Sequence, residues 1–136
     1  MIFKDNLIIN SSKRTEIIDI TSQIQLAIDK SEVSQGIVNI FSKHSTSAIV
    51  VNENERGLLI DFDEILDELI CSDNSYEHDR VDYNADSHLR SFILGSNESI
   101  PITNKKLAIG TWQSIFFIEL DGPRNNRTIE LTIIGE

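Results

Sequence analysis

The feature that most constrains the fold of this chain is a set of short β-branched runs, each about as long as one strand, near both ends of the sequence. In the clearest run, 127–134, Ile129, Leu131 and Ile133 alternate with polar residues. A period of two is typical of a strand with one buried and one exposed face. The first two runs are expected to pair with each other as a hairpin. Runs of this kind predict further strands at 6–10, 14–21, 37–41, 48–51, 99–103, 107–109 and 112–120.

Three stretches between these runs have helical spacing instead, at 22–34, 58–70 and 84–94. Ser22 and Gln25 fit a capping box at the start of the first helix, and Gly36 is placed to end it. In the second helix, apolar residues repeat at i, i+3 and i+4 opposite a row of Asp and Glu. In the third, Ala85, Leu89, Phe92 and Ile93 are expected to face the core.

Strands at both ends of the chain with helices between them, without regular βαβ alternation, indicate an α+β fold. We expect largely antiparallel, sandwich-like sheets with about three short helices. At 136 residues, the chain is long enough to bury a core without disulfides. We therefore expect one domain over 1–136.

The net charge and the cysteine content limit which partners and which cellular compartment are possible. A net charge of -10 and a pI near 4.6 exclude nonspecific binding to nucleic acid or anionic membranes, because such binding depends on Lys and Arg. A small phosphorylated ligand stays compatible, since a local pair of arginines can hold it. The single Cys71 cannot form an internal disulfide, and the first residues lack a secretory pattern, so a cytoplasmic protein is expected. No apolar run approaches the roughly 20 residues that span a bilayer.

Three histidines, His44, His78 and His88, are the strongest candidates for a functional site. Each lies in a polar, irregular or helix-edge segment beside acids, amides or hydroxyls. Neutral imidazole is the commonest zinc ligand, and a neighbouring carboxylate can hold its second ring nitrogen. Three histidines that leave one position open form a known catalytic zinc arrangement, in which bound water has a pKa of about 7. The alternative is three surface or half-buried histidines with ordinary hydrogen bonds.

Four more residues have both a functional and an ordinary interpretation. Glu53, directly after an apolar strand, is a candidate general acid or base, or a solvated glutamate at a strand end. Arg124, with Arg127, lies at a turn where guanidinium groups can grip phosphate, or at an exposed turn or subunit contact. Trp112 is a candidate wall of a ligand pocket, although a lone tryptophan usually belongs to a core.

Several motifs occur together from residue 37 onward: His44-Ser45-Thr46-Ser47-Ala48, Asn52-Glu53, His78, Asn84-Ala85-Asp86-Ser87-His88-Leu89, Gly95-Ser96, Gly110-Thr111-Trp112-Gln113, Asp121-Gly122-Pro123-Arg124 and Gly135-Glu136. As a set, they resemble the YjbQ family of small proteins, whose members are often described as secondary thiamine-phosphate synthases.

The resemblance implies a homotrimer of α+β subunits with a histidine-lined polar pocket, which a neighbouring subunit can complete. It also implies a reaction that joins a hydroxymethylpyrimidine diphosphate to a thiazole phosphate and expels pyrophosphate. Mapped onto this chain, His44, Glu53 and His88 are the expected catalytic residues. The expected ligands of a divalent metal, with zinc the candidate, are His44, His78 and His88. The expected substrate contacts are Ser45, Thr46, Asn84, Trp112 and Arg124.

Two functions of different class therefore stay open, and a purely structural assembly unit is a third alternative. The first is a transferase that acts on a small phosphorylated metabolite. The second is a trimeric protein that binds a metal or a metabolite without turning it over. The acid-rich segment 79–83 replaces glycines that are common in relatives, and its carboxylates suit a cation better than pyrophosphate.

Overall fold

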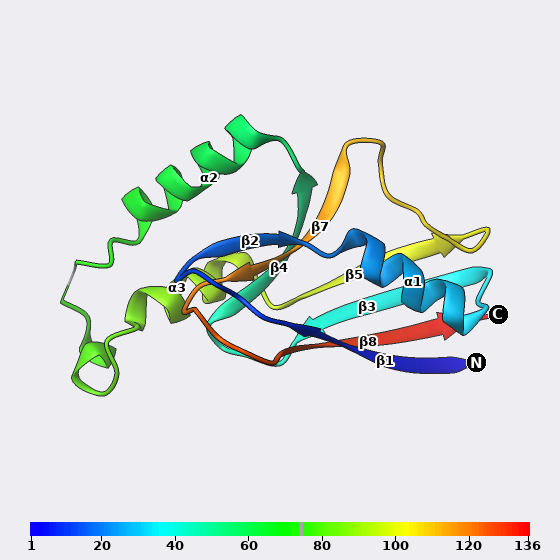
Figure 1. Ribbon diagram of the computed structural model, residues 1–136, viewed down its shortest axis with the longest axis horizontal. Coiled ribbons are helices and arrows are strands. Elements are labelled where there is room, and N and C mark those ends of the chain that lie inside the picture. The colour runs from blue at the N-terminus through cyan, green and yellow to red at the C-terminus, as the bar shows by residue number, and fades with distance from the viewer. Residues whose placement is uncertain (74) are drawn as a thin grey trace.

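Two β-sheets and three α-helices make up the fold in the computed structural model, which describes residues 1–73 and 75–136 (Figure 1). The strands are β1 (Ile2–Ile9), β2 (Glu16–Asp19), β3 (Gln35–Ser42), β4 (Ser47–Glu53), β5 (Asn97–Thr103), β6 (Lys106–Leu107), β7 (Gln113–Glu119) and β8 (Arg127–Gly135). The helices are α1 (Thr21–Ser31), α2 (Arg56–Leu69) and α3 (Ala85–Leu94), with a short 3₁₀ helix η1 (Glu77–Arg80). The predicted α+β class with three short helices is confirmed for the described part of the chain.

The strands form a five-stranded sheet in the order β1-β8-β3-β5-β6 and a three-stranded sheet in the order β2-β7-β4. Every pair is antiparallel, as predicted. The predicted hairpin of the first two strands is wrong, because β1 pairs with β8 and β2 pairs with β7. The chain between them crosses from one sheet to the other, where the Ser11 amide donates to the carbonyl of Arg124 at 2.9 Å. This crossing brings residues after β1 against the turn between β7 and β8.

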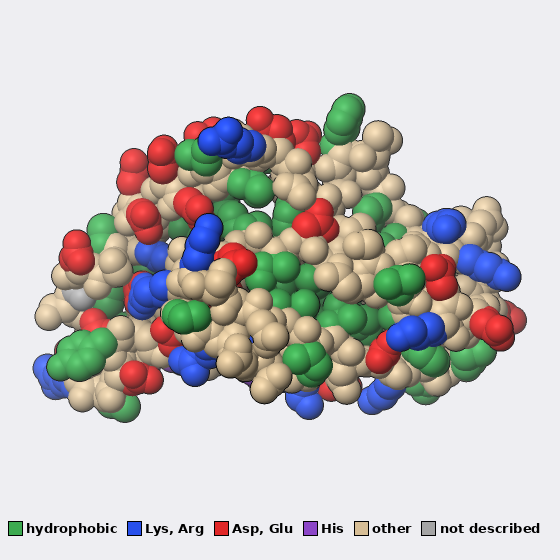
Figure 2. Space-filling view, viewed as in Figure 1, with side chains coloured by type: hydrophobic (Ala, Val, Ile, Leu, Met, Phe, Trp, Pro, Cys, Tyr) green, Lys and Arg blue, Asp and Glu red, His purple; other side chains and the backbone are tan. Residues whose placement is uncertain are grey.

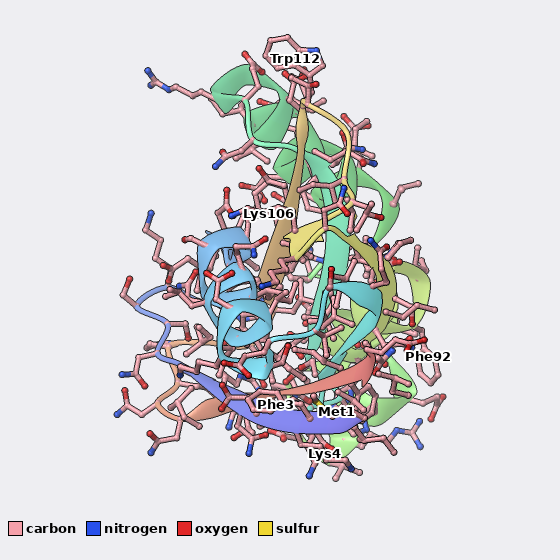
Figure 3. All side chains as sticks on the ribbon, turned by 90° about the vertical axis from the view of Figure 1, so that its right-hand side faces the viewer. Met1, Phe3, Lys4, Phe92, Lys106 and Trp112 are labelled. Atoms are coloured by element: carbon pink, nitrogen blue, oxygen red, sulfur yellow. The ribbon has the colours of Figure 1, made fainter. Side chains whose placement is uncertain are left out.

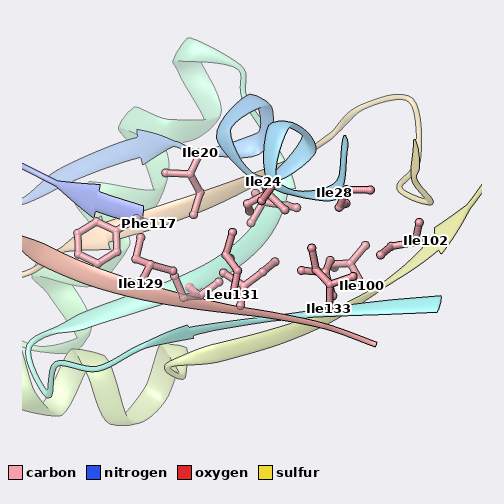
Figure 4. Close-up of a cluster of buried hydrophobic side chains, with 14 of the residues drawn as sticks. Ile20, Ile24, Ile28, Ile100, Ile102, Phe117, Ile129, Leu131 and Ile133 are labelled. Carbon is pink, nitrogen blue, oxygen red and sulfur yellow. The ribbon is translucent and has the colours of Figure 1, made fainter. Parts of the chain in front are cut away.

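The inner face of the five-stranded sheet forms the main core (Figure 4). In β8, Ile129, Leu131 and Ile133 are buried and alternate with less buried polar residues, as predicted. Helix α1 covers this face with Ile24 and Ile28, and β4 and β7 complete the cluster. Burying one such side chain contributes about 1.5–3 kcal/mol.

The central strand of the three-stranded sheet, β7, is buried on both faces. Ile115 and Phe117 join the main core, whereas Phe116 and Ile118 join a second cluster that α2 and α3 cover. A strand buried on both sides has a continuous apolar run rather than an alternating one. The molecule is therefore layered: the five-stranded sheet, then α1 with the three-stranded sheet, then α2 with α3.

The ends of α1 differ from the prediction. The helix begins at Thr21, whose amide and hydroxyl donate to Asp19 at 3.0 and 2.6 Å, so no Ser22–Gln25 capping box forms. Gln25 instead accepts from the Leu107 amide at 3.0 Å and ties α1 to β6. The helix ends at Ser31, and Glu32, rather than Gly36, caps it in the left-handed conformation.

Helix α3 buries Ala85 as predicted, but the rest of the helix faces the opposite way from the prediction. Leu89 and Phe92 are exposed, and the buried face carries polar residues such as Ser87 and Ser91. These hydroxyls donate to the carbonyls of Leu120 and Ser47 at 2.5 and 2.6 Å. The polar face is inside because it satisfies carbonyls at the ends of β7 and β4, and the apolar residues are left outside.

Helix α2 is confirmed as a helix, yet most of its apolar stripe is not buried. Leu66 is its one buried residue, whereas Leu58, Ile65 and Leu69 are exposed. The helix thus meets the sheet along a narrow line, and Figure 1 shows it standing at the upper edge of the molecule. Among the described residues, no helix is both long and apolar enough to cross a membrane.

Candidate functional site

His44 lies in the loop between β3 and β4, and a backbone contact fixes its ring. Nε2 of His44 accepts a hydrogen bond from the amide of Thr128 in β8, at 2.8 Å. An amide can only donate, so this Nε2 carries no proton, and in the neutral ring the proton is on Nδ1. The Nδ1–H group is left as a hydrogen-bond donor.

The surroundings of His44 favour its neutral form. Burial, followed by the positive charge of Arg127, lowers the pKa of His44 from its ordinary 6.5, although Glu119 opposes this shift. The contact with Thr128 acts in the same direction, since protonation of Nε2 would turn the acceptor into a second donor. His44 is therefore neutral at pH 7.

A buried ion pair between Arg127 of β8 and Glu119 of β7 underlies the β3–β4 loop. Glu119 is 0% exposed and Arg127 is 4% exposed. The guanidinium donates to both carboxylate oxygens, and also to the carbonyl and hydroxyl of Thr46. Burial alone would raise the pKa of Glu119, but hydrogen bonds from Arg127 and Ser11 keep it below its ordinary value. Because Glu119 also accepts from the amide of Asp121 at 3.2 Å, the pair holds the loop and the β7–β8 turn together.

His78, in η1, and His88, in α3, lie side by side. Their ring centroids are 4.8 Å apart in an edge-to-face arrangement. Asn84 orients His78, because its Nδ2 donates to Asp121 Oδ2 at 2.8 Å and its Oδ1 lies 3.1 Å from Nε2 of His78. A carboxylate only accepts, so the amide oxygen of Asn84 must face the ring. Nε2 of His78 therefore carries a proton, and in the neutral ring Nδ1 is the atom with a lone pair.

One open pocket of about 650 Å³ brings two of the three histidines together. Its walls include His44, His88, Phe41, Lys43, Ser45 and Phe92. Phe92 is 86% exposed, so its ring faces open space rather than the core. His78 does not line this pocket but contacts His88 from outside it. The pocket combines hydrogen-bond donors with aromatic surface, which suits a ligand that has an anionic group and a planar ring.

The predicted three-histidine metal site does not fit the geometry of one chain. Within residues 1–73 and 75–136, no group of three or more His, Cys, Asp or Glu side chains is arranged to hold a metal ion. The Nε2 lone pair of His44 is already used by the Thr128 amide. Of the predicted set, only His78 and His88 lie in contact.

Glu53 and Trp112 lie away from the histidine pocket in the single chain. Glu53 is the last residue of β4, about 20 Å along the strand from Ser47, where the loop of His44 ends. It lines a separate cavity beneath α2. Gln113 pairs with Glu53, so Trp112 is at the same end, and Figure 3 shows it at the tip of the molecule, well separated from Phe92.

The other predicted substrate contacts fall into two groups. Ser45 is exposed and lines the pocket. Thr46 and Asn84 are buried, and their polar groups are used by Arg127 and by Asp121 with His78. Arg124 is 49% exposed and donates to the carbonyl and carboxylate of Asp121, each at 2.9 Å.

Several residues of this site were not among the sequence candidates, namely Asp121, Glu119, Phe92, Lys43 and Phe41. Glu119 had a signal that sequence reasoning could have used. Arg127 occupies an inward position of the β8 alternation, and a charge there requires a buried partner, which Glu119 at the end of an apolar run supplies. Phe92 had no such signal, because an aromatic residue on a helix is usually part of a core.

Comparison with known proteins agrees with the fold and the motifs. The family model described as UPF0047 protein YjbQ-like matches residues 5–136. The chain belongs to the YjbQ family. A UPF0047 protein of Methanothermobacter thermautotrophicus is 47% identical over 135 residues, which cover 99% of this chain and 94% of that protein.

Solved structures of YjbQ relatives have the same fold. A YbjQ-like protein of unknown function from Sulfolobus solfataricus P2 superposes with a TM-score of 0.97 at 40% identity, covering 100% of this chain and 99% of that one. A hypothetical protein from Aeropyrum pernix K1 gives a TM-score of 0.94 at 33% identity, covering 98% and 99% of the two chains. These similarities establish the family and its fold.

Proposed function

We propose that the pocket of His44 and His88 binds a small phosphorylated metabolite, and that this cytoplasmic chain catalyses a transfer like that of thiamine-phosphate synthase. The observation that carries the proposal is the pocket itself, where two histidines from distant segments meet Lys43 and an exposed aromatic ring, Phe92. The choice of this particular reaction rests on the resemblance of motifs, which is an analogy at the level of the family.

The proposed reaction needs little proton transfer. The ring nitrogen of the thiazole phosphate attacks the methylene carbon of the pyrimidine diphosphate. A carbon–nitrogen bond forms, the carbon–oxygen bond to the diphosphate breaks, and its electron pair leaves with pyrophosphate. The attacking nitrogen becomes the cationic ring nitrogen of the product. What the protein must supply is positioning of two planar rings and donors for the departing negative charge.

The pocket supplies both requirements. The Nδ1–H of neutral His44 is a donor for phosphate oxygens, and Ser45 adds a hydroxyl. The ammonium of Lys43 lies 3.5 Å from Glu130 in the free chain and would exchange this partner for a phosphate oxygen. His88, held against His78, adds a further ring nitrogen. Phe92 offers a flat surface for a heteroaromatic ring. Glu53 has no part in this step within one chain, because it lines a different cavity.

The test is turnover with the two precursors. Protein purified without a metal-affinity tag is incubated with both compounds, and thiamine phosphate and pyrophosphate are measured in parallel. We expect equal amounts of both products and none when either precursor is left out. Saturable binding of the phosphorylated compounds without product would contradict the proposed reaction and favour a binding protein.

A binding protein without turnover is the second candidate. It is favoured by the lining of the pocket, because the donors of His44 and Ser45 and the exposed ring of Phe92 hold a phosphorylated ligand whether or not it reacts. The ligand is then a metabolite or a divalent metal such as zinc. Of the three predicted metal ligands, His78 and His88 lie in contact, and the Nδ1 lone pair of neutral His78 is available to bind the metal. Elemental analysis of tag-free protein, together with the turnover assay, distinguishes the binding protein from the transferase. A stoichiometric metal without turnover supports the binding function.

We also propose that the chain forms the homotrimer implied by the resemblance, through the outer face of the five-stranded sheet. The strand register places an exposed apolar row across this face: Ile2 is opposite Ile134, Ile134 opposite Ile37, and Ile37 opposite Pro101. A contiguous apolar row is unusual on a monomer surface. Light scattering should give a trimer for the native chain and smaller species for Ile134→Lys, with Leu26→Lys on exposed α1 surface unchanged.

A further inference from the structure

An apolar cavity of about 240 Å³ lies between α2 and the three-stranded sheet, separate from the histidine pocket. Its floor is formed by the buried Phe116 and Ile118 of β7. Its roof is formed by Leu59 and Phe62 of α2, which are only half-buried. Figure 2 shows hydrophobic side chains in the region below the acidic outer surface of α2. The half-burial of Leu59 and Phe62 follows from this space, which no side chain of the described residues fills.

One charged group lines this cavity. The residues around it are apolar except Asn52 and Glu53, at the end of β4. The side-chain oxygen of Asn52 already accepts a hydrogen bond from the Glu53 amide at 2.8 Å. The carboxylate of Glu53 has no hydrogen-bond or ion-pair partner anywhere in residues 1–73 and 75–136. An unpaired carboxylate beside apolar walls is complementary to a cation that has an apolar body.

The acidic surface of the protein also favours a cationic ligand. The solvent face of α2 carries Asp61, Asp63, Glu64, Asp67 and Glu68, all exposed. The chain as a whole has a net charge of -10. Such a field raises the concentration of cations near the protein surface and disfavours anions there. The phosphorylated ligands proposed for the histidine pocket are therefore poor occupants of this second space.

We propose that this cavity is a second binding site, which takes a small aromatic or branched-alkyl primary amine. The ring or alkyl group lies between Phe62 and Phe116, and the ammonium group donates to Glu53. The size is appropriate, since an apolar cavity of about 150 Å³ in another protein accepts benzene, and 240 Å³ leaves room for a short aminoalkyl chain. The site stands apart from the proposed transferase reaction and does not depend on it.

The probe is 2-phenylethylamine, with 2-phenylethanol as its neutral counterpart. Each is titrated into the full chain while the methyl signals of Val50, Leu59, Leu94 and Ile118 are followed by NMR. We expect saturable shifts of these methyl groups with the amine, with a Kd on the order of 1 mM for so small a ligand. The alcohol should bind about tenfold more weakly, because it lacks the charge-assisted hydrogen bond to Glu53.

Two variants make the assignment specific. Glu53→Gln should bind the amine and the alcohol equally, and Leu59→Trp, which fills the cavity, should lose both. Leu26→Trp, on the exposed surface of α1, is the matched control and should bind as the native chain does. Equal binding of the two probes by the native chain would overturn the proposal. So would silent methyl signals, or intermolecular contacts between these methyl groups and a second copy in isotope-mixed samples, which would make the cavity a subunit interface.

Discussion

Replacing Arg127 with methionine should destabilise the fold by about 3 kcal/mol or more. The substitution leaves Glu119 fully buried without its charged partner, and loss of one member of a buried pair typically costs about 3–5 kcal/mol. The lower end is expected, because Glu119 keeps hydrogen bonds from the Ser11 hydroxyl and from two backbone amides. Thr46 also loses the donor to its carbonyl and hydroxyl, so the loop of His44 should loosen.

A double-mutant cycle measures the same pair without this excess charge. In Arg127→Met with Glu119→Gln, the amide at 119 is neutral and can still accept from the backbone amides. Urea unfolding followed by circular dichroism should therefore give a coupling energy of about 2 kcal/mol or more between the two positions. Additive effects of the two single substitutions, or a cost below about 1 kcal/mol for Arg127→Met, would refute the argument that the pair holds loop and turn together.

Three other changes test separate parts of the structure. Two hydrogen bonds from Arg14 outweigh burial and keep the pKa of Asp86 below its ordinary value. The ionised Asp86 therefore contributes its full stabilisation at a pH above the ordinary pKa of an aspartate, and this stabilisation is lost as the pH falls through the lower pKa of the folded state. Asp86→Asn should thus remove part of the acid sensitivity seen in urea unfolding. His44, with its lowered pKa, should titrate below 6.5 by NMR, and a midpoint above 6.5 contradicts the assignment. The contribution of neutral His44 to stability should decline as the pH falls from 6.5 towards the pKa of His44 in the folded chain. Phe92→Ala should change stability by less than about 0.5 kcal/mol and raise the KM for the pyrimidine substrate, whereas an unchanged KM would remove Phe92 from the pocket. Leu26→Ala is the control for an exposed apolar residue elsewhere.

The strands and the α+β class could be predicted because the signal is local. The alternation of Ile129, Leu131 and Ile133 depends only on which side of one strand faces the core. The partner of a strand is not a local property, and β1 pairs with the last strand of the chain rather than with β2. The inverted face of α3 has a similar cause, since Ser87 and Ser91 are buried only because carbonyls of other strands lie opposite them.

The candidate site shows the same division. His44 and Glu53 are close in sequence, yet β4 separates them because an extended chain advances about 3.3 Å per residue. His44 and His88 are distant in sequence, yet they line one pocket. The choice of residues followed from the motifs, whereas their grouping required the fold.

The most direct test of the proposed function is the rate of product formation by the native chain and by His88→Ala, with the unfolding free energy of both measured alongside. His88 is partly exposed and contributes little to the core. We predict that the native chain forms thiamine phosphate, and that the variant loses this activity while its stability stays within about 1 kcal/mol. A variant with native activity, or a native chain that makes no product from the two precursors, would contradict the account.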